Sequence, residues 1–240
     1  MVELLHITKR FGSCTALNDV SAHFRSGECV ALIGPNGCGK TTLIKSILGM
    51  VLPSSGEVLF NGKNISESVE YREHIGYMPQ IGRYPDTMTI GNIIDMIREM
   101  RSGGRDTDTE LYDAFALEPM LNKRMRTLSG GTTQKVSAVL AFLFQPDVLI
   151  LDEPTAGLDP LASEILKEKI VAEKEKGKLI LITSHLLNDL EDMASHVMFL
   201  REGIKEFYMP VRDLKSNTNE PTLAKAIASV LRSGMMEAIQ

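Results

Sequence analysis

The residues "GPNGCGKT", Gly34 to Thr41, have the glycine, lysine and threonine spacing of a phosphate-binding loop. The run follows the apolar segment "ECVALI" and precedes a helical pattern over 40–50, which is the context such a loop requires. Backbone N–H groups and the helix N-terminus can bind phosphate oxygens, Lys40 can reach the β- and γ-phosphates, and Thr41 can hold Mg²⁺. The residues expected to contact a nucleotide here are Gly34, Pro35, Asn36, Gly37, Cys38, Gly39, Lys40, Thr41 and, at the α-phosphate, Thr42.

Two carboxylates end the apolar run "VLILDEP", Val148 to Pro154, which predicts a fully buried strand. Asp152 is placed to accept hydrogen bonds from the hydration shell of Mg²⁺. Glu153 is the candidate general base that polarises an attacking water. A strand that ends in Asp-Glu is common by itself, but beside a phosphate-binding loop it predicts hydrolysis of the bound nucleotide.

Two further polar side chains follow strand-like runs. His185 comes just after "LILIT", at the edge of the sheet where open α/β folds bind ligands, so we expect it to contact the γ-phosphate. Gln80 ends "IGYMPQ" at the equivalent edge and offers an amide oxygen to Mg²⁺ or to water. The predicted catalytic residues are therefore Glu153 and His185, and the predicted metal ligands are Thr41, Gln80 and Asp152.

Short apolar runs of strand type alternate with longer helical patterns along the chain, which predicts an α/β fold with a largely parallel sheet. Asn61-Gly62 lies between extended runs in "EVLFNGKNI", a pattern typical of a hairpin, and indicates an antiparallel β-layer beside the parallel core. The expected strands are "VELLHI", "ECVALI", "EVLF", "VLILDE", "KLILIT" and "HVMFL", and the expected helices lie at 40–50, 89–101, 129–144, 161–176 and 186–194.

Strand patterns are missing between Ile81 and Pro146, which predicts a helical subdomain at about 81–145. Helices are expected to start at Thr89, near Thr107 and at Ser129, because these residue types cap helix N-termini. The polar run "RSGGRDTDTE" at 101–110 is expected to be a solvated loop. The main domain is predicted to cover 1–205, and 206–240 to be a tail whose hairpin and polar loop are followed by one amphipathic helix.

Composition limits the class of protein. The chain has 240 residues, of which 43% are apolar, enough for a proper core. Because 31 Asp and Glu outnumber 26 Lys and Arg, no overall basic field attracts nucleic acid or anionic lipid. Three cysteines without metal-ligand spacing fit a reducing compartment. With neither a signal peptide nor an apolar run long enough to span a bilayer, a cytoplasmic location is expected, and any membrane role would require a partner.

In their order along the chain, these motifs resemble those of the ATP-binding subunits of ABC transporters, over residues 1 to about 205. Phe11 of "KRFG" is similar to the aromatic residue that stacks on adenine, although tyrosine is usual there. The resemblance implies a RecA-like P-loop NTPase core with an antiparallel β-subdomain and a helical insertion, and it implies ATP and Mg²⁺ as cofactors. The similar segments are 34–42 (Walker A), Gln80 (Q-loop), 128–132 (signature), 148–153 (Walker B), "AGLD" at 156–159 (D-loop) and His185 (H-loop).

The resemblance also implies a role for "LSGG". In the family this helix start caps the γ-phosphate held by the other subunit of a head-to-tail dimer, so Ser129, Gly130 and Gly131 are expected to contact the partner's nucleotide, as is Asp159 of the D-loop. Exposed glycine N–H groups at a helix N-terminus are suited to bind an anion and let a second backbone approach. Thr132 stands where glutamine is usual and keeps a hydroxyl, so the signature is expected to function.

The leading interpretation is an ATPase that couples hydrolysis to a separate integral membrane permease, as a homodimer at the inner face of the membrane and without a nucleic-acid partner. In the family a coupling helix docks beside the segment "IGRYPDTMTIGNII". Runs such as "MPQIGRYP" and "LASEILKEKI" resemble the ATPase of the system that matures the copper site of nitrous oxide reductase. A generic ABC-2 type or multidrug exporter is the alternative.

Two other classes of protein are less compatible with the sequence. A soluble ABC ATPase acting on chromosomes or ribosomes usually carries a coiled-coil insertion or a tandem duplication together with basic patches, which this chain lacks. A plain P-loop kinase or GTPase would leave "LSGG" and "AGLD" unexplained.

Overall fold

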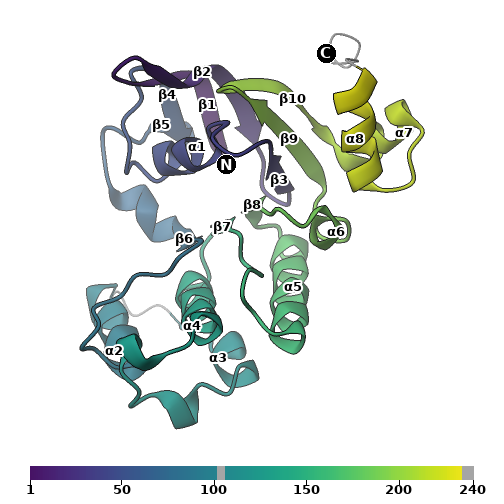
Figure 1. The fold of residues 1–240 in the computed structure, drawn as a ribbon. Helices are drawn as coiled ribbons and strands as arrows, with labels where there is room; N and C mark the ends of the chain where they lie inside the picture. Colours follow the sequence, from purple (N-terminus) through teal and green to yellow (C-terminus); the bar gives the residue numbers. More distant parts are fainter. Residues whose placement is uncertain (102–105, 234–240) are drawn as a thin grey trace.

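A computed structural model describes residues 1–101 and 106–233. At its centre is a six-stranded sheet with the order β10-β9-β3-β8-β7-β6 (Figure 1). Neighbouring strands run parallel except for β9 and the edge strand β10, which are antiparallel. The predicted α/β fold with a largely parallel sheet is therefore confirmed. The strands are β3 (Cys29–Ile33), β6 (Ile75–Met78), β7 (Val148–Asp152), β8 (Leu179–Thr183), β9 (His196–Arg201) and β10 (Ile204–Pro210).

The central strands read as continuous apolar runs because both faces of the sheet are covered. Every residue of β3, β7 and β8 is buried. Alternate residues of β3 enter two separate cores: Ala31 packs in a cluster with helices of the insertion and α5, and Val30 and Leu32 pack in a second cluster with α1 and the antiparallel sheet. On these two faces lie α1 (Lys40–Ile47) and α5 (Pro160–Glu175).

A four-stranded antiparallel sheet with the order β2-β1-β4-β5 forms the second layer, as predicted. Its strands are β1 (Val2–Phe11), β2 (Cys14–Phe24), β4 (Ser55–Phe60) and β5 (Lys63–Asn64). Asn61 and Gly62 have φ angles of 49° and 78°, the positive values that a tight type I′ hairpin turn requires, and they join β4 to β5.

Strand β2 was missing from the sequence prediction. Its buried residues Leu17 and Val20 are three positions apart, because Asp19 has a φ of 54° and the register with β1 shifts nearby. This irregularity breaks the period-two alternation by which a half-buried strand is recognised.

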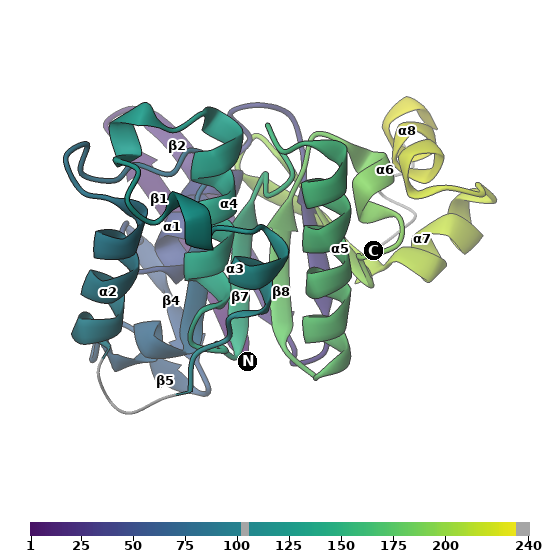
Figure 2. The ribbon, with the colours of Figure 1, turned by 90° about the horizontal axis from the view of Figure 1, so that it is seen from below.

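The helical subdomain contains α2 (Ile90–Met100), α3 (Glu110–Ala114) and α4 (Gly130–Phe142). Figures 1 and 2 show these helices at one end of the molecule, away from α7 and α8. Two predicted caps are confirmed: Thr89 accepts a hydrogen bond from the Asn92 N–H at 3.2 Å, and Ser129 accepts one from the Thr132 N–H at 3.2 Å.

The helix predicted to start near Thr107 is α3, and its N-cap is Thr109, two residues further along the chain. Helix α3 begins at Glu110, whose N–H is bound by the Asp108 carboxylate at 3.0 Å, while the Asp108 N–H is already bound to the Leu143 carbonyl at 2.8 Å. These bonds hold the preceding residues in a non-helical segment. Of the loop expected at 101–110, residues 102–105 lie outside the described part of the chain.

Up to residue 233, where the described part of the tail ends, the chain forms two helices where one was predicted, α7 (Val211–Thr218) and α8 (Leu223–Ser233). Helix α7 occupies part of the expected polar loop, and it forms because Val211 and Leu214 bury one face against the core while its other residues stay polar. The expected boundary at 205 falls inside β10, so the tail continues the central sheet. Helix α6 (Leu187–Leu190) is shorter than the predicted 186–194. In the described part of the chain, no helix has the length and apolar character needed to cross a membrane.

Candidate active site

The phosphate-binding loop connects the buried strand β3 to α1, which begins at Lys40. Gly34 has a φ of 154°, and a Cβ there would lie 2.1 Å from the carbonyl oxygen of Leu200, so the position excludes a side chain. The Lys40 ammonium donates to the carbonyl oxygens of Gly34 at 2.6 Å and Pro35 at 3.1 Å. The loop is thus tightly wound at the N-terminus of a helix, where an anion is favoured.

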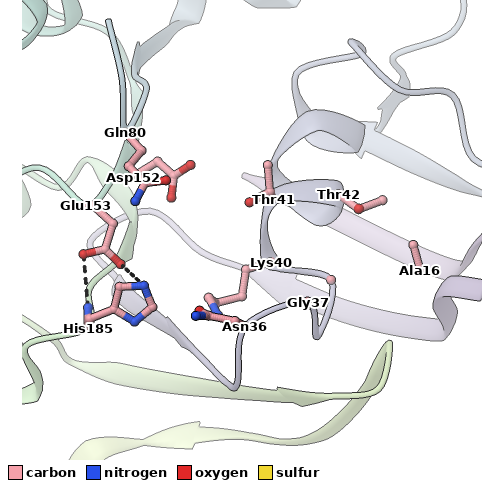
Figure 3. A pocket seen from close by; sticks show the side chains of 11 residues that line it. Ala16, Asn36, Gly37, Lys40, Thr41, Thr42, Gln80, Asp152, Glu153 and His185 are labelled. Carbon is pink, nitrogen blue, oxygen red and sulfur yellow. Dashed lines mark hydrogen bonds and ion pairs between the residues drawn. The ribbon is translucent and has the colours of Figure 1, made fainter.

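A pocket of about 370 Å³ opens in front of this loop. Figure 3 shows Lys40, Thr41 and Thr42 on one side of it, facing Gln80, Asp152, Glu153 and His185 on the other. All four of the latter lie at the carboxyl ends of the parallel strands β6, β7 and β8, as the sequence predicted: Asp152 is the last residue of β7, and the other three come just after strand ends. The lining residues are Ala16, Asn36, Gly37, Gly39, Lys40, Thr41, Thr42, Gln80, Asp152, Glu153 and His185, of which only Ala16 was not predicted.

Asp152 ends β7 and is held by the neighbouring strand. Its Oδ1 accepts a hydrogen bond from the Thr183 hydroxyl at 2.6 Å, and the two residues are paired in the ladder between β7 and β8. Only 9% of Asp152 is exposed. The carboxylate is therefore fixed at the floor of the pocket rather than free to rotate.

Glu153 adopts a left-handed backbone conformation, with a φ of 53°, which is sparsely populated by residues that carry a Cβ. Its carboxylate accepts the backbone N–H of His185 at 3.1 Å, and the His185 Nε2 lies 3.4 Å from the second carboxylate oxygen (Figure 3). The Glu153 side chain is 11% exposed and that of His185 is 58% exposed. A buried carboxylate thus lies beside an imidazole that is open to the pocket.

Gln134 of α4 also contacts the backbone that follows β7, at Glu153 and Pro154. Its side-chain amide donates to the carbonyl oxygens of Glu153 at 3.3 Å and Pro154 at 3.4 Å. Sequence reasoning missed Gln134 and Thr183. The only sequence signals for them are a glutamine near the start of an apolar helix and a threonine at a strand end.

The predicted residues of the signature and the D-loop lie outside the lining of this pocket. Ser129, Gly130 and Gly131 form the N-terminus of α4, and Asp159 caps α5 by accepting the Ala162 N–H at 2.9 Å. The Lys135 ammonium lies 2.7 Å from the Asp159 carboxylate, and this hydrogen bond lowers the pKa of Asp159. Within one chain, the signature residues and Asp159 therefore do not line the pocket in front of the phosphate loop.

Phe11 and the remaining loop residues also lie outside the lining. Phe11 ends β1 at the hairpin that leads to Ala16, and its ring is half exposed with the Lys9 ammonium 4.9 Å from its centre. Cys38 is buried, and the carbonyl oxygens of Gly34 and Pro35 accept hydrogen bonds from the Lys40 ammonium. Stacking of Phe11 on a base stays a prediction.

Comparisons with known proteins agree with this geometry. The family model described as "ABC transporter" matches residues 17–156, more than half of the chain. The Nod factor export ATP-binding protein I of Burkholderia orbicola is 32% identical over 209 residues, which cover 85% of this chain and 69% of that protein. An uncharacterized ABC transporter ATP-binding protein of Bacillus subtilis, YcbN, is 32% identical over 223 residues, covering 92% of this chain and 73% of that protein.

Solved structures give the same fold. A structure titled as the ATP binding subunit of an ABC transporter superposes with a TM-score of 0.88 at 30% identity, covering 96% of this chain and 99% of that one. The ATP-binding cassette MJ0796, titled as a dimer in a post-hydrolysis state with ADP and Pi, gives a TM-score of 0.78 at 24% identity, covering 88% of this chain and 98% of that one. The chain therefore belongs to the ABC transporter family, as an ATPase subunit that binds ATP.

Proposed function

We propose that this chain hydrolyses ATP with Mg²⁺ in the pocket between the phosphate loop and the strand ends. The observation that carries the proposal is that Lys40, Thr41, Gln80, Asp152 and Glu153 all line one pocket, although they come from distant parts of the sequence. A hydroxyl, an amide oxygen and a carboxylate form the oxygen-rich donor set that Mg²⁺ prefers. Thr41, Gln80 and Asp152 would hold the ion, which when bound neutralises phosphate charge.

Hydrolysis is assigned to the residues around Glu153. The Glu153 carboxylate accepts a proton from a water molecule as the water oxygen bonds to the γ-phosphorus, and the bond to the bridging oxygen breaks to release ADP. Lys40 and His185 stabilise the negative charge of the transferring group. His185 also supports the base, because its backbone N–H binds the Glu153 carboxylate.

The test is Glu153→Gln in the purified full chain. ATP binding should survive, while turnover should fall by about 10²–10⁴-fold, the contribution typical of a general base. Glu202→Gln is the matched control, because Glu202 is an exposed glutamate that also has a positive φ of 51°. Full turnover of the Glu153→Gln variant would remove the proposed base.

A second copy of this chain is proposed to complete the site. The N-terminus of α4 carries Gly130, where a Cβ would meet no atom of the described residues within 4 Å. Such an open backbone suits the approach of another molecule's γ-phosphate. Two chains would then enclose two ATP molecules head to tail. Light scattering on Glu153→Gln should detect dimers with ATP and monomers without it, and a monomer at saturating ATP would contradict this arrangement.

The partner that receives the energy is proposed to be an integral membrane permease. A groove of about 400 Å³ is lined by β6, by residues just after α1 and just before β6, and by the helical subdomain, with three arginines, Arg72, Arg83 and Arg101, among apolar side chains. An amphipathic cytoplasmic helix of the permease that carries an acidic residue would fit this groove. The other lining residues are Leu48, Met50, Ile75, Gly76, Tyr77, Pro79, Tyr84, Ile97 and Leu140.

Reversal of one charge tests this docking site. Arg83→Glu should abolish co-purification with the permease, whereas Arg212→Glu, on the exposed face of α7, should leave the complex intact. Membrane fractionation of cells that express the chain should place it at the inner membrane face only when the permease is present. If no integral membrane protein co-purifies, the alternative is a soluble ABC ATPase without a transport role.

We propose two transport systems that this ATPase could energise, and they differ in the cargo. Assembly of the copper site of nitrous oxide reductase rests on local sequence runs alone, whereas an ABC-2 type or multidrug exporter gains support from the relatives named for Nod factor export. Disruption of the gene that encodes this chain distinguishes the two systems. Loss of copper from nitrous oxide reductase supports the first system, and normal copper content together with accumulation of an exported compound supports the second.

A further inference from the structure

Thr183 is the last residue of β8 and pairs directly with Asp152, the last residue of β7. It is 1% exposed and does not line the pocket, so it does not touch a bound nucleotide. We infer that Thr183 is a positioning residue for hydrolysis, one that orients the Asp152 carboxylate and the Glu153 backbone through a single hydroxyl group. This inference rests on the proposed function.

The two hydrogen-bond partners of the Thr183 hydroxyl determine which bond it accepts and which it donates. The Thr183 Oγ1 accepts the backbone N–H of Glu153 at 3.0 Å and donates to the Asp152 Oδ1 at 2.6 Å. A hydroxyl has one proton, and the Glu153 N–H can only donate, so the Thr183 proton is directed at the carboxylate. The bond therefore fixes which of the two Asp152 carboxylate oxygens is occupied by Thr183.

The same contact holds the unusual backbone of Glu153. Residues in the left-handed region persist only where their surroundings fix them. The Glu153 N–H is shared between the hydroxyl of Thr183 and the carbonyl oxygen of Thr183, at 3.0 and 3.2 Å. Because the φ of 53° sets the direction of the Glu153 side chain, Thr183 controls where the base points.

A purely structural role of the Thr183 hydroxyl would give different experimental results. If the hydroxyl only satisfies buried polar groups, its loss would lower thermal stability and leave the catalytic constants unchanged. If it positions the two carboxylates, its loss lowers kcat and weakens the effect of Mg²⁺ on nucleotide affinity. Affinity for ATP in EDTA, which depends on the phosphate loop, would not change.

The experiment compares Thr183→Val with Thr183→Ser in the full chain. Valine matches threonine in shape but lacks the hydroxyl, and serine keeps the hydroxyl but lacks the methyl group. We expect Thr183→Val to lower kcat by about 10–100-fold, the range typical when a residue supporting a metal ligand is lost. The KM for ATP should change by less than about threefold, the Mg²⁺ requirement should rise, and Thr183→Ser should restore kcat.

The outcomes are distinct from those that test the proposed function. If the unaltered chain fails to hydrolyse ATP with Mg²⁺, the proposed function fails. If it hydrolyses ATP and Thr183→Val retains full kcat and Mg²⁺ dependence, or Thr183→Ser is as impaired as Thr183→Val, the positioning role is overturned. If Thr183→Val does not fold, Thr183→Cys replaces the hydroxyl with a thiol, a weaker hydrogen-bond donor of similar size. Its kcat and Mg²⁺ dependence should change in the same direction but by less. Full kcat in Thr183→Cys would also overturn the inference.

Discussion

The side chain of Gln134 binds the backbone of Glu153, with 3.3 Å between its Nε2 and the Glu153 carbonyl oxygen. Gln134 lies on α4, the helix whose N-terminus carries Ser129 and Gly130. A single helix thus connects the signature segment with the candidate base of the same chain. If the signature contacts the nucleotide bound by a second copy, a change at that nucleotide can move α4. Gln134, which binds the backbone of Glu153 in its own chain, would then move with the helix.

Replacement of Gln134 should therefore affect stability and turnover together. Gln134 is buried, so Gln134→Leu leaves two carbonyl oxygens without their amide donor and should lower the free energy of unfolding by about 1–3 kcal/mol. The kcat for ATP should fall while ATP affinity is retained. Chemical denaturation and steady-state kinetics measure both effects. Thr133→Ala, one position earlier on the helix, is the control and should keep kcat.

The two glycines of the signature should respond in opposite ways to alanine. A Cβ at Gly130 would be open, and alanine favours a helix, so Gly130→Ala should leave the isolated chain as stable or stabilise it by up to about 1 kcal/mol. A Cβ at Gly131 would lie 2.7 Å from the carbonyl oxygen of Gly157, so Gly131→Ala should destabilise the same chain.

Measurement of ATP turnover distinguishes a functional role of Gly130 from an effect on the stability of the chain. Because its open space is proposed to receive a second copy, Gly130→Ala should abolish hydrolysis and ATP-dependent dimers despite normal thermal unfolding. Normal turnover in this variant would mean that the open glycine does not serve a partner.

A buried ion-pair cluster on α5 should make stability depend on acid pH. Burial of the Glu173 carboxylate would raise its pKa, but hydrogen bonds from Lys176, Lys178 and Lys169 outweigh that effect and lower the pKa from 4.5 to about 2. A carboxyl group with a depressed folded-state pKa stabilises the fold above its unfolded pKa. That stabilisation is lost as the pH falls from about 4.5 to about 2.

The expected contribution is on the order of 3 kcal/mol, because folding lowers the pKa of Glu173 from 4.5 to about 2. Glu173→Gln should lower stability near neutral pH and flatten its decline between pH 4.5 and 2, as followed by urea denaturation at several pH values. Glu175→Gln, an exposed neighbour, should leave the profile unchanged. A profile unaltered by Glu173→Gln would show that the cluster adds no acid-labile stability.

Phe11 provides a test of adenine stacking. Loss of a base–aromatic stack costs about 1–3 kcal/mol, so Phe11→Ala should weaken ATP affinity by roughly 5- to 150-fold. Phe11→Tyr keeps the ring and should bind normally. Because Phe11 is 51% exposed, neither change should greatly alter thermal unfolding. Equal ATP affinity of all three proteins in a titration would rule out stacking.

The sequence predicted features that depend on local pattern, and it missed those that depend on packing. Strands β3, β7 and β8 are predictable because burial on both faces makes them apolar, except for the last residues of β7 and β8, Asp152 and Thr183. The phosphate loop and the carboxylates Asp152 and Glu153 were found because their chemistry requires fixed spacing. Helix α7 was missed because two apolar residues, Val211 and Leu214, are enough to dock its mostly polar sequence.

Thr183 and Gln134 could not be found in the same way. The role of Thr183 follows from the register between β7 and β8, which places it opposite Asp152. The contact of Gln134 with Glu153 follows from how closely α4 packs against the end of β7. Neither relationship leaves a pattern in the linear order of residues.

The central place of β3 has a consequence for synthesis of the protein. This strand lies between β8 and β9, and the Cys29 N–H binds the Ser195 hydroxyl oxygen, 166 positions later in the chain. During translation, β3 and the nucleotide loop that follows it therefore lack both neighbouring strands until most of the chain has left the ribosome. Until then its uniformly apolar residues are open to chaperones or to aggregation, and a truncated nascent chain would not hold ATP.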